Sequence, residues 1–462
     1  MQNQPDPRPR RRRRPRPKAN TGAGRLSTIL GIAGIAAAIF LVVFCLKLAL
    51  SPEKTENPTI SQDTTPSPTQ PNQPKVVAEA TILSHGDLLM HSYLFTSNPK
   101  YLAEAYQGEG SYNFDSIFQY VTPYVQGADY SVANLETTLG GTAQPYSGNP
   151  LFNCPDALAD AAAAAGFDML LTANNHCHDT GAAGLKRTLE QIRSRDLQAL
   201  GTQLDDSEKK YLVQDIGGIQ VGMLCFTYTS GLEADGSPNL NFDPATVVKE
   251  PGIVNYFSTQ NLDAFYAQVQ SLLDSMKADG AQATMLYIHW GSEYQTTENQ
   301  VQQAMAQKLC DLGIDVIIGS HPHVVQPVDL LSSGTDPDHK TLVIYSLGNA
   351  VSNQRKEELQ DSCPTGHTED GVLFQVTFQM DELGQVRLSQ VQLIPTWVNK
   401  FTNGNGRVEY NILPLEEAQQ GSWESLFALT PGQLSACQAS YQRTMAIVGP
   451  GLEKVNAYLA AP

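Results

Sequence analysis

The sequence contains no Cys-x-x-Cys pair and no internal repeat of the length that builds solenoid proteins. Without such a pair, a structural zinc site made only of sulfur ligands is excluded. Seven cysteines are present, one of them inside an apolar N-terminal run, and the others are scattered without the spacing of a disulfide scaffold. Disulfides and buried free thiols are both open for these six, which are Cys154, Cys177, Cys225, Cys310, Cys363 and Cys437.

Basic residues are scarce outside the N-terminus. Residues 1–25 hold nine Lys or Arg and one acid, a charge of +8, so the rest of the chain carries −25 of the total of −17. Hydrophobic residues make up 41% and charged residues 17%, as expected for a folded body. A basic arm can bind nucleic acid, but the segment that follows it favours a membrane role, and we predict no nucleic-acid partner.

Residues 29–46, "ILGIAGIAAAIFLVVFCL", are 18 residues without a charge. This run can cross a hydrocarbon core about 30 Å thick, and no signal-peptide cleavage pattern follows it. A buried core helix is the alternative, which the neighbouring arginines disfavour. Because basic flanks stay in the cytoplasm, we predict a single-pass cell-membrane protein with a cytoplasmic N-terminus. Its parts would be a basic cytoplasmic tail (1–25), a transmembrane anchor (26–50), a Pro/Thr/Ser-rich stalk (51–77) and an extracytoplasmic main domain.

From residue 78 onward, short apolar runs alternate with helical patterns, which predicts an α/β fold with helices covering the sheets. Asp156 and Gly166 stand at the start and end of the first of these helices. The expected strands are 79–84, 129–133, 168–173, 219–228, 283–288, 315–320 and 341–346, with a hairpin over 371–381 and 384–395. The expected helices are 155–167, 181–196, 258–280 and 298–313, and we predict a main domain over 78–417 with a helical extension over 418–462.

Polar clusters follow six of the expected strands. They are His85-Gly86-Asp87, Asn134-Leu135-Glu136, Asn174-Asn175-His176 with Asp179, His289-Trp290-Gly291 with Glu293, His321-Pro322-His323, and Gly348-Asn349. Ligands of open α/β sheets bind outside the carboxyl ends of the strands, so we expect one shared polar site. Imidazoles, carboxylates and amides suit divalent Mn, Fe, Zn or Mg. One or two such ions would activate water and hold a phosphoryl or acyl group.

Each of these residues also has an ordinary structural interpretation. His85 and His178 fit loop positions, and His91 fits a surface or supporting role better than a ligand role. Asn134 and Glu136 are residue types common in turns and caps. The argument for a site therefore depends on the joint occurrence of these clusters in order along the chain.

Several motifs together resemble the CapA family of poly-γ-glutamate capsule-biosynthesis proteins, which is related to calcineurin-like metallophosphoesterases. The resemblance covers roughly residues 78–415. It implies a metallophosphoesterase-like pair of packed β-sheets flanked by helices (αββα), with metal ions bound by loops at one edge. The motifs are "GDLLMH", "ANLETTLGG", "YSGNPLFNCP", "LLTANNHCHDTGAAGLKRTLE", "IHWGSEYQ", "GSHPHVVQPV" and "YSLGNAVSNQ".

The resemblance also implies roles for individual residues. His176 would donate a proton or orient the substrate, and Asp179 would orient His176. The implied metal ligands are Asp87, Glu136, Asn175, His289, His321 and His323, with Asn134, His91, Asn174 and Glu293 as further candidates. Two motifs depart from the phosphoesterase pattern. No histidine stands two residues after Asp87, and Asn-Leu-Glu replaces Gly-Asp-x-x-Asp, so Glu136 takes the place of the bridging aspartate.

Three functions are then open. The first is synthesis or export of an anionic, poly-γ-glutamate-type capsule polymer by a membrane-anchored protein with a metal-dependent hydrolase-like site. The second is a metal-dependent phosphoesterase or amide hydrolase of cell-envelope material, and the third is a non-enzymatic assembly factor with a structural metal. The expected partners are the membrane, through 29–46, other capsule synthesis or export proteins, and an anionic polymer or envelope substrate. Because an acidic body repels a polyanion, a metal-lined groove or a partner protein is favoured over broad electrostatic binding.

Overall fold

The computed structural model describes residues 74–250 and 252–461. The predicted tail and anchor, and the stalk up to residue 73, lie outside this range. Over the described part of the chain, no helix combines the length and the apolar character needed to cross a membrane.

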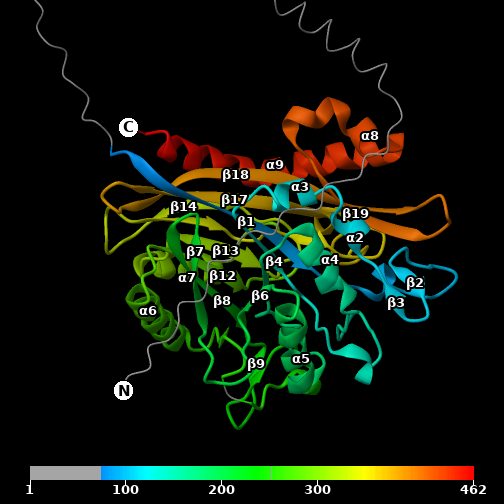
Figure 1. The fold of residues 1–462 in the computed structure, drawn as a ribbon, viewed down its shortest axis with the longest axis horizontal. Coiled ribbons are helices and arrows are strands. Elements are labelled where there is room, and N and C mark those ends of the chain that lie inside the picture. The colour runs from blue at the N-terminus through cyan, green and yellow to red at the C-terminus, as the bar shows by residue number, and fades with distance from the viewer. Residues whose placement is uncertain (1–73, 251, 462) are drawn as a thin grey trace, which may run out of the picture. The chain divides into compact units, whose positions relative to one another are not determined.

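Two β-sheets form the centre of the described chain (Figure 1). The first has the order β19-β18-β17-β1-β4-β5-β6, with β16 also paired to β1. Strand β1 divides this sheet, because it runs antiparallel to β17 on one side and parallel to β4 on the other. The strands are β1 (Val76–Leu88), β4 (Tyr130–Asn134), β5 (Met169–Leu171), β6 (Gln198–Leu200), β16 (Asn349–Val351), β17 (Asp370–Asp381), β18 (Val386–Thr402) and β19 (Val408–Pro414).

The second sheet has the order β11-β8-β12-β13-β15-β14, with β7 also paired to β8. Its central strands β8, β12, β13 and β15 are mutually parallel, so their carboxyl ends meet at one edge. The strands are β7 (Tyr211–Ile216), β8 (Ile219–Tyr228), β11 (Tyr256–Phe257), β12 (Ala283–His289), β13 (Val316–Ser320), β14 (Val328–Ser332) and β15 (Lys340–Ile344). Two small hairpins lie outside both sheets: β2 (Tyr106–Gly108) with β3 (Ser111–Tyr112), and β9 (Gly231–Leu232) with β10 (Pro238–Asn239).

The two sheets pack face to face, because one buried cluster contains side chains of both, such as Ile82 of β1 and Met285 of β12. A second cluster covers the outer face of the first sheet, and a third joins the second sheet to α6 and α7. Helices thus cover both outer faces of a two-sheet core. The helices are α2 (Asp115–Phe118), α3 (Thr122–Val125), α4 (Ala157–Ala165), α5 (Gly181–Arg193), α6 (Leu262–Ala278), α7 (Gln300–Asp311), α8 (Trp423–Leu426) and α9 (Pro431–Leu459), with short 3-10 turns between them.

Helix α9 lies along the first sheet beside β18 and also contacts β14 of the second sheet (Figure 1). It begins with a capping box in which Thr430 and Gln433 each bond the other's backbone N–H. Its apolar residues Val448 and Val455 are fully buried in the cluster between the sheets. The helical extension expected over 418–462 thus contains α9, and α9 is part of the packed core.

Of the two residues expected to mark the ends of α4, one behaves as predicted and the other does not. Gly166 ends the helix with a left-handed φ of 100°, a conformation that glycine adopts without strain. Asp156 occupies the N-terminal cap position but makes no capping bond. Its carboxylate instead forms a two-pronged ion pair with Arg187 of α5, at 2.7 and 2.6 Å.

Of the two histidines assigned to loops, one is in a strand. His85 is not a loop residue: it lies within β1 and is 1% exposed. His178 does lie in a turn, but it is buried. The six cysteines named above are free and buried.

Candidate metal centre

The end of β1 places Asp87 against β16. A Cβ atom on Gly86 would lie 1.9 Å from the Gly348 carbonyl oxygen, so only glycine fits there. The next residue, Asp87, donates its backbone N–H to that same oxygen at 3.1 Å. The Gly-Asp pair thus brings the Asp87 carboxylate to the edge of the first sheet.

A chain of amides then fixes one oxygen of this carboxylate. Asn174 Nδ2 donates to Asn134 Oδ1 at 3.1 Å, and Asn134 Nδ2 donates to Asp87 Oδ1 at 2.7 Å. Asn174 is held in turn by the Leu135 carbonyl at 2.8 Å. Asn134 and Asn174, both further ligand candidates, therefore support Asp87, and Asp87 Oδ2 is left facing the centre without a hydrogen bond.

Glu136, which follows β4, is 0% exposed, and neither of its carboxylate oxygens has a hydrogen-bond partner. Burial, followed by the charges of Asp87 and Glu293, raises the pKa of Glu136 well above its usual value. Its Oε1 lies 3.4 Å from His289 Nε2 and 3.7 Å from His323 Nε2. A carboxylate buried in this way needs a compensating cation or a proton.

The second sheet supplies the facing imidazoles. His289 ends β12, with its Nδ1 held by the Ser320 hydroxyl at 2.8 Å and its Nε2 2.8 Å from Asn175 Oδ1. Burial lowers the pKa of His289 to about 3, so its ring is neutral at pH 7. A neutral imidazole is the form that binds a metal ion.

The Ser-His-Pro-His segment, which begins with the last residue of β13, bends sharply at both histidines. His321 and His323 have φ values of 97° and 57°, in the left-handed region that non-glycine residues rarely adopt. Their ring centroids are 6.0 Å apart, and the His321 ring lies 4.9 Å from that of His289. His323 Nδ1 lies 3.2 Å from Asn349 Oδ1 and 3.4 Å from Asp87 Oδ2. Burial alone would lower the pKa of His323, but the nearby Asp87 carboxylate raises it.

These donors fit a divalent cation. Within the described ranges, two groups hold donor atoms that all lie within 4.8 Å of one another: Glu136 with His321 and His323, and Asp87 with Glu136 and His289. Several of these buried atoms lack a hydrogen-bond partner, including both Glu136 oxygens, Asp87 Oδ2 and His321 Nδ1. Because buried polar atoms are almost always satisfied, a bound divalent ion would account for this set. Glu136 belongs to both groups.

His176 and Asp179 form a pair beside this centre. His176 Nδ1 lies 2.7 Å from Asp179 Oδ2, and that same oxygen accepts the Phe152 backbone N–H at 2.6 Å. Asp179 thereby orients the ring in a site where His176 is only 7% exposed. The structure thus brings together these two residues and the six implied ligands.

The two remaining candidates lie at the periphery. His91 is half-buried, with Nδ1 3.3 Å from the Leu89 carbonyl, and its ring packs on Phe152, which in turn packs on His176. Glu293 is exposed and belongs to neither donor group. Sequence reasoning missed two supporting residues, Ser320 and Asn241, and it gave Asn349 a place in the shared polar site without a role. Asn349 stands after an expected strand, whereas nothing in the local sequence marks Asn241.

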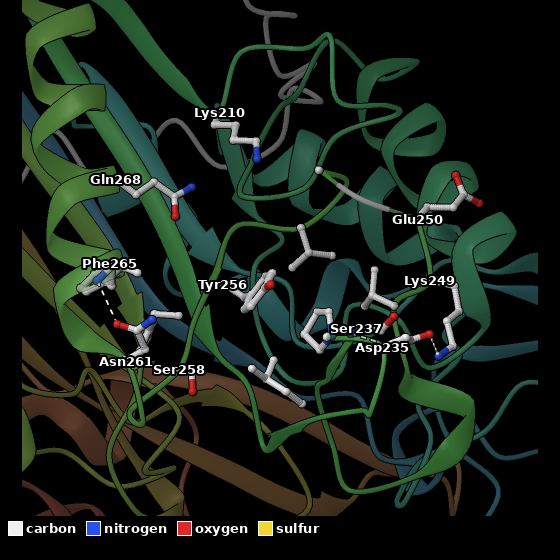
Figure 2. Close-up of a pocket in the computed structure, with 18 residues that line it drawn as sticks. Lys210, Asp235, Ser237, Lys249, Glu250, Tyr256, Ser258, Asn261, Phe265 and Gln268 are labelled. Carbon is white, nitrogen blue, oxygen red and sulfur yellow. Dashed lines mark hydrogen bonds and ion pairs between the residues drawn. The ribbon is translucent and has the colours of Figure 1, made fainter.

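A cavity of about 690 Å³ lies between the β9-β10 hairpin and the start of α6, and Figure 2 shows Lys210 and Tyr256 among its lining side chains. None of the candidate ligands lines it. Two of its charged residues pair with lysines: Asp235 with Lys249 at 2.8 Å and Glu250 with Lys186 at 2.5 Å. This cavity is therefore distinct from the candidate metal centre.

The fold and the cluster define an α/β protein of two packed sheets with buried metal-type donors where strands of both sheets end. The family model described as "Bacterial capsule synthesis protein PGA_cap" matches residues 81–354, more than half of the chain and all the candidate site residues. The chain belongs to this family of bacterial capsule synthesis proteins.

Two curated proteins are similar to this chain. One is "Capsule biosynthesis protein CapA" of Bacillus anthracis, 30% identical over 258 residues, which are 54% of this chain and 57% of that protein. The other is "PGA biosynthesis protein CapA" of Bacillus subtilis (strain 168), 30% identical over 257 residues, which are 54% of this chain and 60% of that protein. The chain thus covers less than two thirds of the length of either relative.

Proposed function

We propose that this chain takes part in the synthesis or export of an anionic capsule polymer of the poly-γ-glutamate type, through a metal-dependent hydrolase-like site. The single observation that carries the proposal is Glu136, a fully buried carboxylate with no hydrogen bond, enclosed by imidazoles of the second sheet. The family membership and the printed names of the two relatives support the capsule role.

Asp87, Glu136, Asn175, His289, His321 and His323 would hold one or two divalent ions, which when bound supply an activated water and charge stabilisation for a phosphoryl or acyl group. His176 would then exchange a proton with the substrate through Nε2, because its Nδ1 faces Asp179. Asp179 keeps the ring in that orientation through the carboxylate oxygen that Phe152 N–H also bonds. The phosphoesterase-like reaction is favoured by this histidine–aspartate pair, which a purely structural metal site would not need.

We further propose that residues 29–46 anchor the protein in the cell membrane with the described body outside the cytoplasm. An apolar, uncharged run of this length preceded by arginines supports this topology. A membrane-fractionation experiment combined with protease treatment of intact cells tests it. We expect the protease to digest the described body on intact cells. Full protection of the body from the protease would contradict this topology.

The metal is tested directly by elemental analysis of the purified full-length protein beside a His321→Ala/His323→Ala double variant. At least one divalent ion per chain is expected in the wild type, with loss in the double variant. A screen with model phosphodiesters, phosphomonoesters and γ-glutamyl amides then tests the reaction. Metal-bound wild type that turns over none of these, together with unchanged capsule formation by the double variant, would favour the non-enzymatic assembly role.

A further inference from the structure

Asn241 reaches the candidate metal centre from a part of the chain that sequence reasoning left aside. It follows β10, in the irregular stretch that joins β8 to β11, and is half-buried. Its Oδ1 accepts a hydrogen bond from Asn175 Nδ2 at 3.3 Å, and its Nδ2 donates to the Pro150 carbonyl at 3.4 Å. Both contacts are long, so they are suited to orienting the amides and add little stability.

These two contacts together determine which way the Asn175 amide faces. A carbonyl oxygen only accepts, so the NH₂ group of Asn241 must face Pro150. The Asn241 oxygen then faces Asn175 and attracts the NH₂ group of that residue. As a result, Asn175 Oδ1 faces the candidate metal centre and lies 2.8 Å from His289 Nε2.

The backbone of Asn241 is itself held in place. Its N–H donates to Thr246 Oγ1 at 3.1 Å, and the Asp243 carboxylate caps the following turn by accepting from Ala245 N at 2.8 Å. The next residue, Phe242, adopts a left-handed φ of 56° and is 79% exposed. The turn thus directs Asn241 inward and Phe242 outward.

We propose that Asn241 is a positioning residue, which selects the one amide orientation in which Asn175 presents oxygen, and not nitrogen, to a bound divalent metal. This inference rests on the metal centre proposed above. An amide rotated by a half turn would offer its NH₂ group, which has no lone pair available for a cation. Supporting residues of this kind typically change metal affinity about 10- to 100-fold.

The experiment measures Mn²⁺ affinity of the full-length protein by titration calorimetry, with Zn²⁺ as a second probe. Four proteins form a double-mutant cycle: wild type, Asn241→Ala, Asn175→Asp and the double variant. We expect Asn241→Ala to weaken Mn²⁺ binding by about 10-fold or more. In the Asn175→Asp background the same change should have little effect, because a carboxylate presents oxygen in either orientation.

The matched control is Asn405→Ala, an exposed asparagine in the β18-β19 turn, which should bind Mn²⁺ as the wild type does. If Asn241→Ala does not fold, Asn241→Ser, whose side chain cannot span both partners, replaces it. Equal Mn²⁺ affinity of wild type and Asn241→Ala would overturn the inference, as would an equal loss in both Asn175 backgrounds. Failure of the wild type itself to bind either metal would instead overturn the proposed metal centre.

Discussion

Glu136 and His289 come from different sheets, yet Glu136 Oε1 and His289 Nε2 lie 3.4 Å apart in the buried interior. Glu136 follows β4 of the first sheet and His289 ends β12 of the second. The candidate metal centre is therefore built at a junction between the two sheets, and a bound cation would link them.

Replacing Glu136 by Gln removes a buried carboxyl group that has no hydrogen-bond partner. Without metal we expect the variant to unfold at a temperature equal to or above that of the wild type, because such a carboxyl group is destabilising whether it stays charged or must take up a proton. Saturating Mn²⁺ should raise the melting temperature of the wild type but not of the variant. By mass action, free Mn²⁺ at one hundred times its dissociation constant should stabilise the folded wild type by about 2.7 kcal/mol.

Differential scanning calorimetry of full-length protein, with and without a chelator, measures this effect. Glu453→Gln, an exposed position on α9, is the control and should respond to Mn²⁺ like the wild type. A melting temperature of the wild type that is indifferent to Mn²⁺, Zn²⁺ and chelator would contradict a bound cation at Glu136.

Replacing Asp179 by Asn should separate reaction from metal binding. The change removes the charged partner of His176 Nδ1 but leaves an oxygen for Phe152 N–H. With a substrate identified by the screen above, kcat should fall by about 100-fold or more, the usual contribution of a general acid or base. Metal content by elemental analysis should stay at the wild-type level. In the exposed control Asp338→Asn, both kcat and metal content should equal those of the wild type. Unchanged kcat would show that the pair is structural.

Replacing Gly86 by Ala should disrupt the end of β1. The new Cβ would lie 1.9 Å from the Gly348 carbonyl oxygen, so β16 would have to move away from Asp87. We expect a loss of about 3 kcal/mol or more in the free energy of unfolding, at the upper end of overpacking effects. Urea denaturation measures it. Gly432→Ala in α9, where the added Cβ meets no atom within 4 Å, should be close to neutral. A stable, metal-binding Gly86→Ala protein would be evidence against the close approach of the two strands.

Arg443 of α9 forms a two-pronged ion pair with Asp370, the first residue of β17, at 2.9 and 2.7 Å. Burial raises the pKa of Asp370 to about 6, although the charge of Arg443 opposes this shift. Arg443→Met would leave the buried carboxylate without its cation and raise its pKa further. We expect a loss of about 3 kcal/mol at pH 7, as for other broken buried pairs.

The sign of the pH dependence follows from the raised pKa. The folded state of the variant binds a proton more tightly than the unfolded state, so its stability relative to the wild type should fall as the pH rises from 4 to 7. Urea denaturation at several pH values measures this, and Asp370→Asn in the same background should restore part of the loss. Lys454→Met, also on α9, breaks a more exposed ion pair with Asp329 of β14 and should cost less than about 1 kcal/mol. Equal losses in both methionine variants would contradict the special role of Asp370.

Much of the secondary structure is readable from local pattern. The run 219–228 is strand β8, and the helical pattern of 181–196 contains α5. In α5 the apolar residues recur at helical spacing, whereas β8 is a nearly continuous apolar run of the kind expected for a strand buried on both faces. The pattern is less informative for short or half-polar strands. Neither β7 nor β16 was expected, because β7 has mostly half-exposed residues and β16 is three residues long.

The sequence by itself determined that apolar strands end in imidazoles, carboxylates and amides, and therefore that a polar site lies at strand ends. Only the tertiary structure decided which of these meet. Strand pairing and sheet packing depend on contacts between residues far apart in the chain, as between β1 and β16. For the same reason His85 is buried within a strand, and Asn241 lies beside Asn175 although 66 residues separate them. The residue types at the strand ends thus specify the donor atoms, and long-range packing brings these atoms together in one centre.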